Sequence, residues 1–362
     1  MLRLWKTRVL RMPSPSPGRA TVRQLAAQLG LSAATVSRAL NGHAYVSEQT
    51  RRRVQEAARQ LSVQAPAPGR RPRAQGAVYV RCPYELTDYF GPIVSSVAET
   101  LRLHGRELLL DAGTAGYHDA VLRRLPSRRD VAAAVLILPP ESVADLEALR
   151  ASGKPFVVID PRVRVPKDVL AVSAANFAGA HDATAHLTAL GHRRIGVISV
   201  APALAAGDAR MAGHASALAQ VGELVDAELI RGGEPVAGTG EKLGGDLLDL
   251  PQRPTAVICF NDKVAVGVLQ AAFDRGLRVP EDLSVVGFDD IDVARSTTPR
   301  LTTVRQPLQE MGRMAVTALM RVLDGHRAEA LHIELATELI VRNSTAPAPG
   351  TAQPVRNATP LL

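Results

Sequence analysis

The sequence contains only two cysteines in 362 residues, Cys82 and Cys259. They lie far apart in apolar stretches, and neither has a second cysteine or a histidine at the spacing of a metal site. This scarcity argues against a disulfide scaffold or a structural zinc site. We therefore expect both thiols to be buried and reduced, and we expect neither a metal nor a cofactor.

Long apolar segments are missing as well. No stretch reaches the roughly 18 consecutive apolar residues of a membrane span. The first ten residues are cationic but lack the apolar run and the small-residue cleavage site of an export signal. We expect a cytoplasmic, nucleoid-associated protein without membrane contact, whose translation starts at Met1 or at Met12.

Acidic residues are scarce at one end of the chain. Residues 1–73 carry 14 Lys and Arg against 2 Asp and Glu, whereas the remainder carries 29 against 33. A basic charge confined to one end is typical of binding to the phosphate backbone of DNA, because each contact releases condensed counterions. A basic disordered tail or a solvated basic face would have the same charge and remains an alternative.

Proline-rich stretches divide the chain into five parts. We predict a disordered extension over residues 1–19, a helix-turn-helix domain over 20–62, a Pro/Arg-rich linker over 63–75, a two-lobed effector-binding and dimerisation domain over 76–343, and a disordered tail over 344–362.

The large body alternates short apolar runs with helix-period segments. The runs that predict buried strands cover residues 77–80, 107–110, 133–138, 156–159, 195–199, 256–260 and 283–287. The helical segments cover residues 93–104, 179–190, 264–275 and 308–323. This order predicts an α/β fold with parallel sheets flanked by helices, in which ligands bind at the carboxyl ends of the strands.

The basic module reads as three short helices. Thr21 with Gln24 forms a capping box for the first helix, and its buried stripe is Val22, Leu25, Ala26 and Leu29. Gly30 ends it, Ser32 caps a second helix with Val36 and Leu40 inside, and Ser47 caps a third that packs through Val54, Ala57, Ala58 and Leu61. The pattern fits a helix-turn-helix, but any small three-helix bundle would show it too.

Several motifs resemble the LacI/GalR (lactose/galactose repressor) family of transcriptional regulators. In the basic module they are residues 21–26 (TVRQLA), 31–42 (LSAATVSRALNG) and 46–51 (VSEQTR). In the body they are residues 186–195 (HLTALGHRRI), 254–262 (PTAVICFND), 276–290 (GLRVPEDLSVVGFDD) and 299–307 (PRLTTVRQP). The resemblance implies a helix-turn-helix headpiece joined to two periplasmic-binding-protein-like lobes, with an effector in the cleft between them.

The resemblance also implies which residues contact DNA. By position they are Thr21, Ser32, Ala33, Ala34, Thr35, Ser37, Arg38, Asn41, Tyr45 and Ser47. Ala33, Ala34 and Arg38 would read bases, since small residues let the helix enter the major groove and arginine can donate two hydrogen bonds to guanine.

The linker departs from the family, in which a short helix here inserts a leucine into the minor groove. The matching positions hold Val63, Ala65, Pro66 and Pro72. Since prolines disfavour that helix, kinking of the minor groove is in doubt; a short helix over residues 69–75 is the alternative.

For the cleft, the resemblance implies contacts from Asp160, Arg210, Asn261 and Asp289, with Tyr89 and Phe90 as an aromatic pair at the edge. Carboxylates and a guanidinium suit a polyol. Each also has a structural interpretation: Asp289 could cap a helix, Asn261 could hold a turn, and Arg210 could pair with Asp208. Thr87 and Asp88 depart from the family, and the only tryptophan is Trp5, so no indole can stack on a sugar.

Two other features invite a catalytic interpretation. His186 and His192 lack further ligands at metal spacing, so we interpret them as structural. Residues 238–244 (GTGEKLG) lack the spacing of a phosphate-binding loop, and we interpret them as a loop entering a helix.

Together these patterns predict a DNA-binding regulator that is not an enzyme, most simply a repressor, controlled by a small sugar-like or nucleoside-like effector. The alternative is a solute-binding protein without DNA function. We expect a homodimer without tetramers, because one headpiece offers little surface and the C-terminus lacks heptads, and hence a near-palindromic double-stranded operator.

Overall fold

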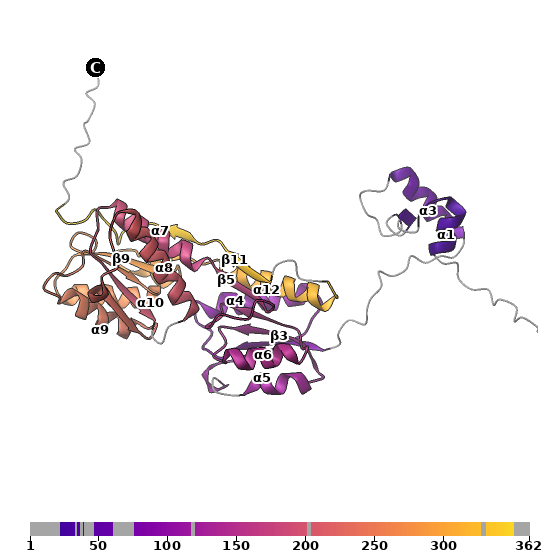
Figure 1. Cartoon of the computed structure of the whole chain (residues 1–362), viewed down its shortest axis with the longest axis horizontal. Coiled ribbons are helices and arrows are strands. Elements are labelled where there is room, and N and C mark those ends of the chain that lie inside the picture. Colours follow the sequence, from indigo (N-terminus) through magenta and orange to yellow (C-terminus); the bar gives the residue numbers. More distant parts are fainter. Residues whose placement is uncertain are drawn as a thin grey trace, which may run out of the picture. The chain divides into compact units, whose positions relative to one another are not determined.

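The computed structural model describes residues 22–32, 35–36, 39, 47–60, 76–116, 120–200, 204–326 and 331–350. The chain divides into two compact units, Met1–Arg73 and Ala74–Leu362, which are coloured along the sequence in Figure 1. In the described part of the chain, no helix is long and apolar enough to span a membrane.

The first unit is built around a small apolar core between α1 (Val22–Leu29) and α3 (Glu48–Gln60). The core consists of Leu25, Ala26, Val36, Ala39, Val54 and Ala58. Gly30 ends α1 at φ +65°, a left-handed conformation in which glycine carries no steric penalty. Ser32 accepts a hydrogen bond from the Thr35 N–H at 3.0 Å, and Ser47 accepts one from the Thr50 N–H at 3.3 Å. Both predicted serine caps are therefore confirmed.

The second unit contains two lobes, each with a six-stranded sheet (Figure 1). The sheet of the N-lobe has the order β11-β5-β4-β3-β1-β2 and is entirely parallel. Its strands are β1 (Ala77–Cys82), β2 (Leu108–Ala112), β3 (Val131–Ile137), β4 (Phe156–Ile159), β5 (Leu170–Ala174) and β11 (His332–Leu335). One face is covered by α4 (Phe90–Leu103) and α12 (Leu308–Leu323), and the other by α5 (Val121–Arg124) and α6 (Val143–Ala151).

The C-lobe repeats this strand order as β12-β10-β9-β8-β6-β7, with only β12 antiparallel. Its strands are β6 (Ile195–Val200), β7 (Ile230–Gly233), β8 (Ala256–Cys259), β9 (Ser284–Asp289), β10 (Thr302–Arg305) and β12 (Glu338–Ile340). The helices α7 (Asn176–Ala189) and α8 (Ala205–Gln220) cover one face, and α9 (Ala237–Leu248) and α10 (Asp262–Asp274) cover the other; the short α11 spans Val293–Ser296. All seven predicted strands and all four predicted helices are present, with ends that differ by at most a few residues.

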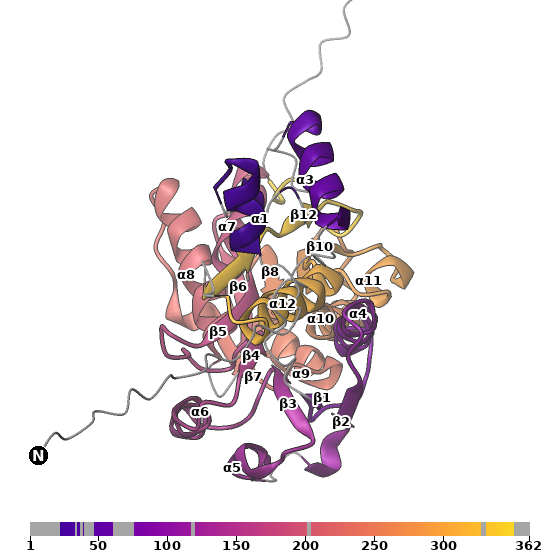
Figure 2. The same ribbon diagram turned by 90° about the vertical axis from the view of Figure 1, so that its right-hand side faces the viewer.

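The chain passes between the lobes three times. It leaves the N-lobe after β5 to enter α7, returns between β10 and α12, and leaves again between β11 and β12. Figures 1 and 2 both show α12, from late in the sequence, beside α4 from the first half of the body. The carboxyl ends of parallel strands from both lobes therefore meet where these three segments cross.

The interpretation of residues 238–244 as a loop is wrong, because they lie inside α9. The glycines of this segment allow α9 and α10 to touch through their backbones. A Cβ added to Gly240 would lie 2.0 Å from the Val264 carbonyl oxygen, and one added to Gly267 would lie 2.0 Å from that of Ala237. The segment is a helix-packing surface.

The expectation that the tail begins at residue 344 is also wrong. Ser344 is buried, donates to the Val285 carbonyl at 2.6 Å and accepts from the Thr302 N–H at 2.8 Å. His192 contacts the Thr255 hydroxyl at 2.8 Å and the Ala346 carbonyl at 3.0 Å. Polar side chains thus hold residues 344–346 against the C-lobe, and the Ala348 N–H donates to the Leu190 carbonyl; the Pro/Ala-rich composition did not indicate these contacts. Residues 351–362 of the predicted tail lie outside the described residues.

His186 and His192, which invited a metal interpretation, contact Thr345 and Ala346 of this segment. His186 Nε2 lies 3.0 Å from the Thr345 hydroxyl, and burial lowers the pKa of both imidazoles. Among the described residues, no group of three or more potential ligands could hold a metal ion.

Candidate functional site

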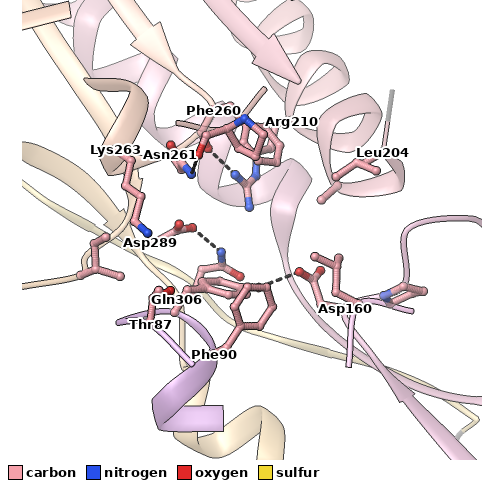
Figure 3. A pocket seen from close by; sticks show the side chains of 16 residues that line it. Thr87, Phe90, Asp160, Leu204, Arg210, Phe260, Asn261, Lys263, Asp289 and Gln306 are labelled. Carbon is pink, nitrogen blue, oxygen red and sulfur yellow. Dashed lines mark hydrogen bonds between the residues drawn. The ribbon is translucent and has the colours of Figure 1, made fainter. Parts of the chain in front are cut away.

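A cavity of about 140 Å³ lies between the two lobes, at the carboxyl ends of their strands. All six residues predicted for the cleft line it: Tyr89, Phe90, Asp160, Arg210, Asn261 and Asp289. Figure 3 shows the carboxylates of Asp160 and Asp289 reaching in from opposite sides and Arg210 entering between them. The fold therefore brings together residues up to 200 positions apart.

Strand ends position the two carboxylates. Asp160 follows β4 with φ +50°, and Asp289 ends β9 with φ +112°. Residues other than glycine rarely adopt such angles, and they concentrate at functional sites because the surrounding structure must hold them. Burial and this backbone turn both carboxylates into the cavity instead of toward solvent.

The N-lobe contributes two aromatic side chains at the start of α4. The Tyr89 hydroxyl donates to Asp160 Oδ2 at 2.6 Å, and burial, followed by the nearby Asp160 charge, raises the pKa of Tyr89. The Phe90 ring stacks on Tyr84 with centroids 4.7 Å apart and an interplanar angle of 2°. This stacking fixes Phe90 as an apolar wall of the cavity.

Arg210 projects from α8 and is held by aromatic rings and two acceptors. Its guanidinium carbon lies 3.5 Å from the centroid of Phe288 and 4.5 Å from that of Phe260. Nε donates to Asn176 Oδ1 at 2.9 Å, and Nη1 donates to the Phe260 carbonyl. The proposed pairing with Asp208 does not occur between these described residues, and the Nη2 end remains directed at the cavity (Figure 3).

Asn261 and Asp289 differ in how far the protein already uses their polar atoms. Asn261 caps α10 by accepting from the Val264 N–H at 2.9 Å, and its amide donates to the Pro235 carbonyl at 3.2 Å. The structural interpretation of Asn261 as the holder of a turn therefore describes its hydrogen bonds. Asp289 does not cap a helix; its Oδ1 accepts from Gln306 Nε2 at 2.6 Å.

The sequence analysis missed two polar residues of the cavity, Gln306 and Lys263. Gln306 Oε1 is buried without a hydrogen-bond partner, which is rare for a native polar atom. Lys263 extends from the first turn of α10 toward Asp289 (Figure 3). Gln306 follows β10 within the quoted motif at residues 299–307, so its strand-end position could have indicated it.

Two carboxyl groups, Asp160 and Asp289, and two cations, Arg210 and Lys263, carry the charges of the cavity. Burial raises the pKa of Asp160, and it raises that of Asp289 to about 7 with help from the Asp160 charge, against the opposing influence of Arg210. Asp262, fully buried below the cavity, accepts from Thr303 Oγ1 at 2.5 Å and from the Ile291 N–H at 2.9 Å. Its pKa is raised well above the usual value by burial and by Asp289.

In the basic module, the structure describes three of the predicted DNA contacts: Ser32, Thr35 and Ser47. Ser32 and Thr35 share a hydroxyl contact of 2.8 Å at the start of the second helix, and Ser32 and Ser47 are exposed. The other predicted contacts lie outside the described residues: Thr21, Ala33, Ala34, Ser37, Arg38, Asn41 and Tyr45. The linker positions Val63, Ala65, Pro66 and Pro72, and the alternative short helix over residues 69–75, lie outside them too.

Comparison with known families gives two matches along the chain. Residues 21–63 match the bacterial regulatory proteins of the lacI family, and residues 184–345 match a periplasmic binding protein-like domain. Together they include the basic module and most of the C-lobe.

Whole-length relatives are regulators of transcription. The chain is 32% identical over 333 residues to the HTH-type transcriptional repressor CytR of Escherichia coli K12, covering 91% of this chain and 97% of that one. It is 34% identical over 339 residues to the HTH-type transcriptional regulator MalR of Streptomyces coelicolor, covering 90% and 96%.

Solved structures show the same architecture. A complex of the transcriptional regulator CelR with cellobiose superposes with a TM-score of 0.69 at 30% identity, covering 90% of this chain and all of that one. The lac repressor dimer bound to operator and an anti-inducer superposes with a TM-score of 0.67 at 24% identity over 91% of this chain, a likeness of fold alone.

Proposed function

Because the chain belongs to the LacI family of DNA-binding transcriptional regulators, we propose that a small polar effector binds the cavity between its lobes and thereby changes its affinity for operator DNA. The effector would be a sugar or a nucleoside, and the protein would act as a repressor.

One observation carries this proposal: uncommitted polar atoms converge on a cavity that is otherwise apolar. Among the described residues, no hydrogen bond occupies Arg210 Nη2, Lys263 Nζ or Gln306 Oε1. Asp160 and Asp289 each use one carboxylate oxygen and leave the other available. A ring with several hydroxyl groups would donate to the acceptors and accept from the cations, while its apolar face packs on Phe90.

Thermal unfolding of the full-length protein with a panel of sugars and nucleosides tests the effector site. A true effector at a hundred times its dissociation constant adds about 2.7 kcal/mol of stability and raises the Tm accordingly. Arg210→Gln should abolish the shift. The matched control is Arg300→Gln, which removes an exposed arginine outside the cavity and should preserve it. An equal shift in wild type and Arg210→Gln would contradict the assignment of the site.

We further propose that Arg38 reads a base, in agreement with the family resemblance of the residues around it. Arg38→Ala should cost about 1–3 kcal/mol on the operator and relax preference at one base pair in each half-site. Arg51→Ala, which we expect to remove a contact with a phosphate, should weaken binding to all sequences alike. Equal losses on specific and random DNA for Arg38→Ala would refute base reading.

A homodimer would present two headpieces to a near-palindromic operator. Exposed leucines at the edge of the N-lobe sheet support it: Leu103 at the end of α4 is 80% exposed, and Leu109 and Leu110 lie on the edge strand β2. An unpaired edge with apolar side chains favours association.

Sedimentation velocity at micromolar concentration should give a dimer and no tetramer. Leu103→Glu with Leu110→Glu should give a monomer, whereas Leu224→Glu, at an 87% exposed position after α8, should leave the dimer intact. A monomeric wild type, or a stable tetramer, would contradict the proposal.

A further inference from the structure

Two buried carboxyl groups from opposite lobes share the cavity, and the hydrogen bonds that they accept come from uncharged donors. Asp160 is 6% exposed and Asp289 is 7% exposed. Each accepts one hydrogen bond from an uncharged group, the Tyr89 hydroxyl at 2.6 Å and the Gln306 amide at 2.6 Å. Two carboxylates in one desolvated space repel each other, so full ionisation of both is disfavoured.

In the described part of the chain, the nearby cations donate no hydrogen bond to Asp160 or Asp289 that would offset the repulsion between these two carboxylates. Arg210 directs its bonded N–H groups to Asn176 and to the Phe260 carbonyl, and neither carboxylate accepts from it among the described residues. Lys263 lies beside Asp289 but donates no hydrogen bond to it. Both cations therefore act on Asp289 only through space.

Several charged or titratable groups face Asp289 among the described residues. They are Arg210 on α8, Asp160 after β4, Tyr89 before α4, Asp88 in the same loop, and Asp262 and Lys263 in the first turn of α10. The neighbouring Asp290 is neutralised elsewhere, by Arg342 at 2.5 Å, Arg305 at 2.7 Å and Arg295 at 3.4 Å. Around Asp289, carboxyl groups outnumber cations.

We propose that, in the ligand-free protein, the carboxyl groups between the lobes hold a proton, chiefly on Asp289, and that an effector whose hydroxyl groups donate to Asp289 displaces this proton to solvent. When no ligand is bound, protonation of one carboxyl removes the repulsion between the two buried carboxylates. A hydroxyl donor from a ligand makes the ionised carboxylate the better acceptor, so the proton leaves as the ligand binds. The ligand half of this inference rests on the function proposed above.

The consequence is an effector affinity that depends on pH near neutrality. Burial raises the pKa of Asp289 to about 7, so the carboxyl is mostly protonated at pH 6 and mostly ionised at pH 8. If binding requires the ionised form, affinity should rise about tenfold between these two pH values. The response of the regulator to a fixed effector concentration would then follow intracellular pH.

The proton on the carboxyl groups is tested on the protein without any ligand. Thermal unfolding of the full-length protein is followed from pH 5 to pH 8.5 for wild type, Asp289→Asn and Asp292→Asn. The asparagine at 289 keeps the oxygen that accepts from Gln306 but cannot ionise. Asp292 is an exposed carboxyl three residues away and serves as the control.

A carboxyl with a raised pKa destabilises the folded state increasingly as pH rises from its unfolded pKa to its folded pKa. The Tm of Asp289→Asn relative to wild type should therefore increase by about 5 °C between pH 5 and pH 7.5 and then stay constant. Asp292→Asn should run parallel to wild type. Parallel profiles for wild type and Asp289→Asn would overturn the proposal.

Displacement is tested with ribose, cellobiose and cytidine as probes. A probe that raises the Tm of wild type should bind about tenfold more tightly at pH 8 than at pH 6. Equal affinity at both pH values would overturn displacement. If none of the three binds while the ligand-free profiles diverge, the proton site stands and the proposed effector class fails for these compounds.

Discussion

The two lobes share one strand order but equip the cavity with different groups. The C-lobe supplies both cations, Arg210 and Lys263, together with Asp289. The N-lobe supplies one carboxyl, Asp160, and the aromatic residues Tyr89 and Phe90. The C-lobe therefore carries most of the charged groups that would select a polar ligand, whereas the N-lobe contributes apolar surface and one carboxyl acceptor.

The lobes also differ in how their helices pack. In the C-lobe, α9 and α10 touch backbone to backbone at Gly240 and Gly267. In the N-lobe, α4 and α12 approach less closely, since a Cβ at Gly312 would lie 2.7 Å from the Ile93 carbonyl oxygen. Added volume is therefore tolerated less between α9 and α10 than between α4 and α12.

The largest expected effect follows from this packing. Gly267→Val should destabilise the C-lobe by more than about 4 kcal/mol, because the added side chain would clash with the rigid backbone of α9. Gly238→Ala, where no atom lies within 4 Å of the added Cβ, should be neutral or stabilising. Chemical denaturation followed by circular dichroism measures both. A Gly267→Val protein as stable as Gly238→Ala would show that the close approach does not exist.

The second-largest effect should be a loss of stability of the C-lobe in acid, caused by His214. His214 on α8 is buried against the Thr184 hydroxyl at 3.0 Å, and burial lowers its pKa to about 4. Its unfolded pKa is about 6.5, so the folded state binds fewer protons between these values and loses stability as pH falls through them. The stability of wild type relative to His214→Gln should fall by about 3 kcal/mol from pH 7 to pH 4. A constant difference across that range would contradict the assignment.

A smaller effect tests the segment that begins at Ser344 and packs against the C-lobe. Ser344→Ala removes a hydroxyl that both donates and accepts in a buried position, and should cost about 2 kcal/mol. Ser296 at the end of α11 is an exposed serine of the same lobe, and its hydroxyl donates to the Asp292 carbonyl at 3.1 Å, so Ser296→Ala is the matched control. Urea denaturation compares the two variants. If Ser344→Ala cost no more than Ser296→Ala, residues 344–350 would not be a structural part of the lobe.

The smallest effect should come from the N-lobe side of the cavity. Tyr89→Phe removes the donor to Asp160 but keeps the aromatic surface, so effector affinity should fall by about 1 kcal/mol, roughly fivefold. Arg210→Gln should cost more, because it removes the cation between the carboxylates. Calorimetric titration of an identified effector compares them. A greater loss for Tyr89→Phe would reverse the roles assigned to the two lobes.

The sequence revealed those parts of the fold that depend on local patterns. Buried strands such as β4 and β8 are continuous apolar runs, so their positions could be predicted. The edge strands β7 (IRGG), β11 (HIEL) and β12 (ELI) are short and partly exposed, so they carry no such run and were missed. The mostly buried strands β5 (LAVSA) and β10 (TTVR) were missed as well, because serine and threonine residues interrupt or replace the apolar run. In α9, glycines that usually indicate a loop instead allow helix contact, which only the partner helix α10 makes evident.

The residues of the site likewise divide into those that the sequence indicates and those that only the folded structure reveals. Asp160, Asn261 and Asp289 follow predicted strands, so parallel-sheet topology already places them at one edge. The environment of Arg210 depends on Asn176 and on two phenylalanine rings from other elements, and no spacing in the sequence indicates these contacts. The unpartnered oxygen of Gln306 likewise becomes visible only when the surrounding packing is known.

The central claim is that effector binding in the cavity controls DNA binding by the same chain. The most direct measurement is the affinity of the full-length protein for a duplex selected from random sequences, with and without the compound that raises its Tm, in wild type and in Arg210→Gln. The account predicts a change of about tenfold or more in operator affinity for wild type, and unchanged DNA binding for Arg210→Gln with or without the compound. A compound that binds the cavity without altering operator affinity, or a wild-type protein that selects no duplex, would contradict it.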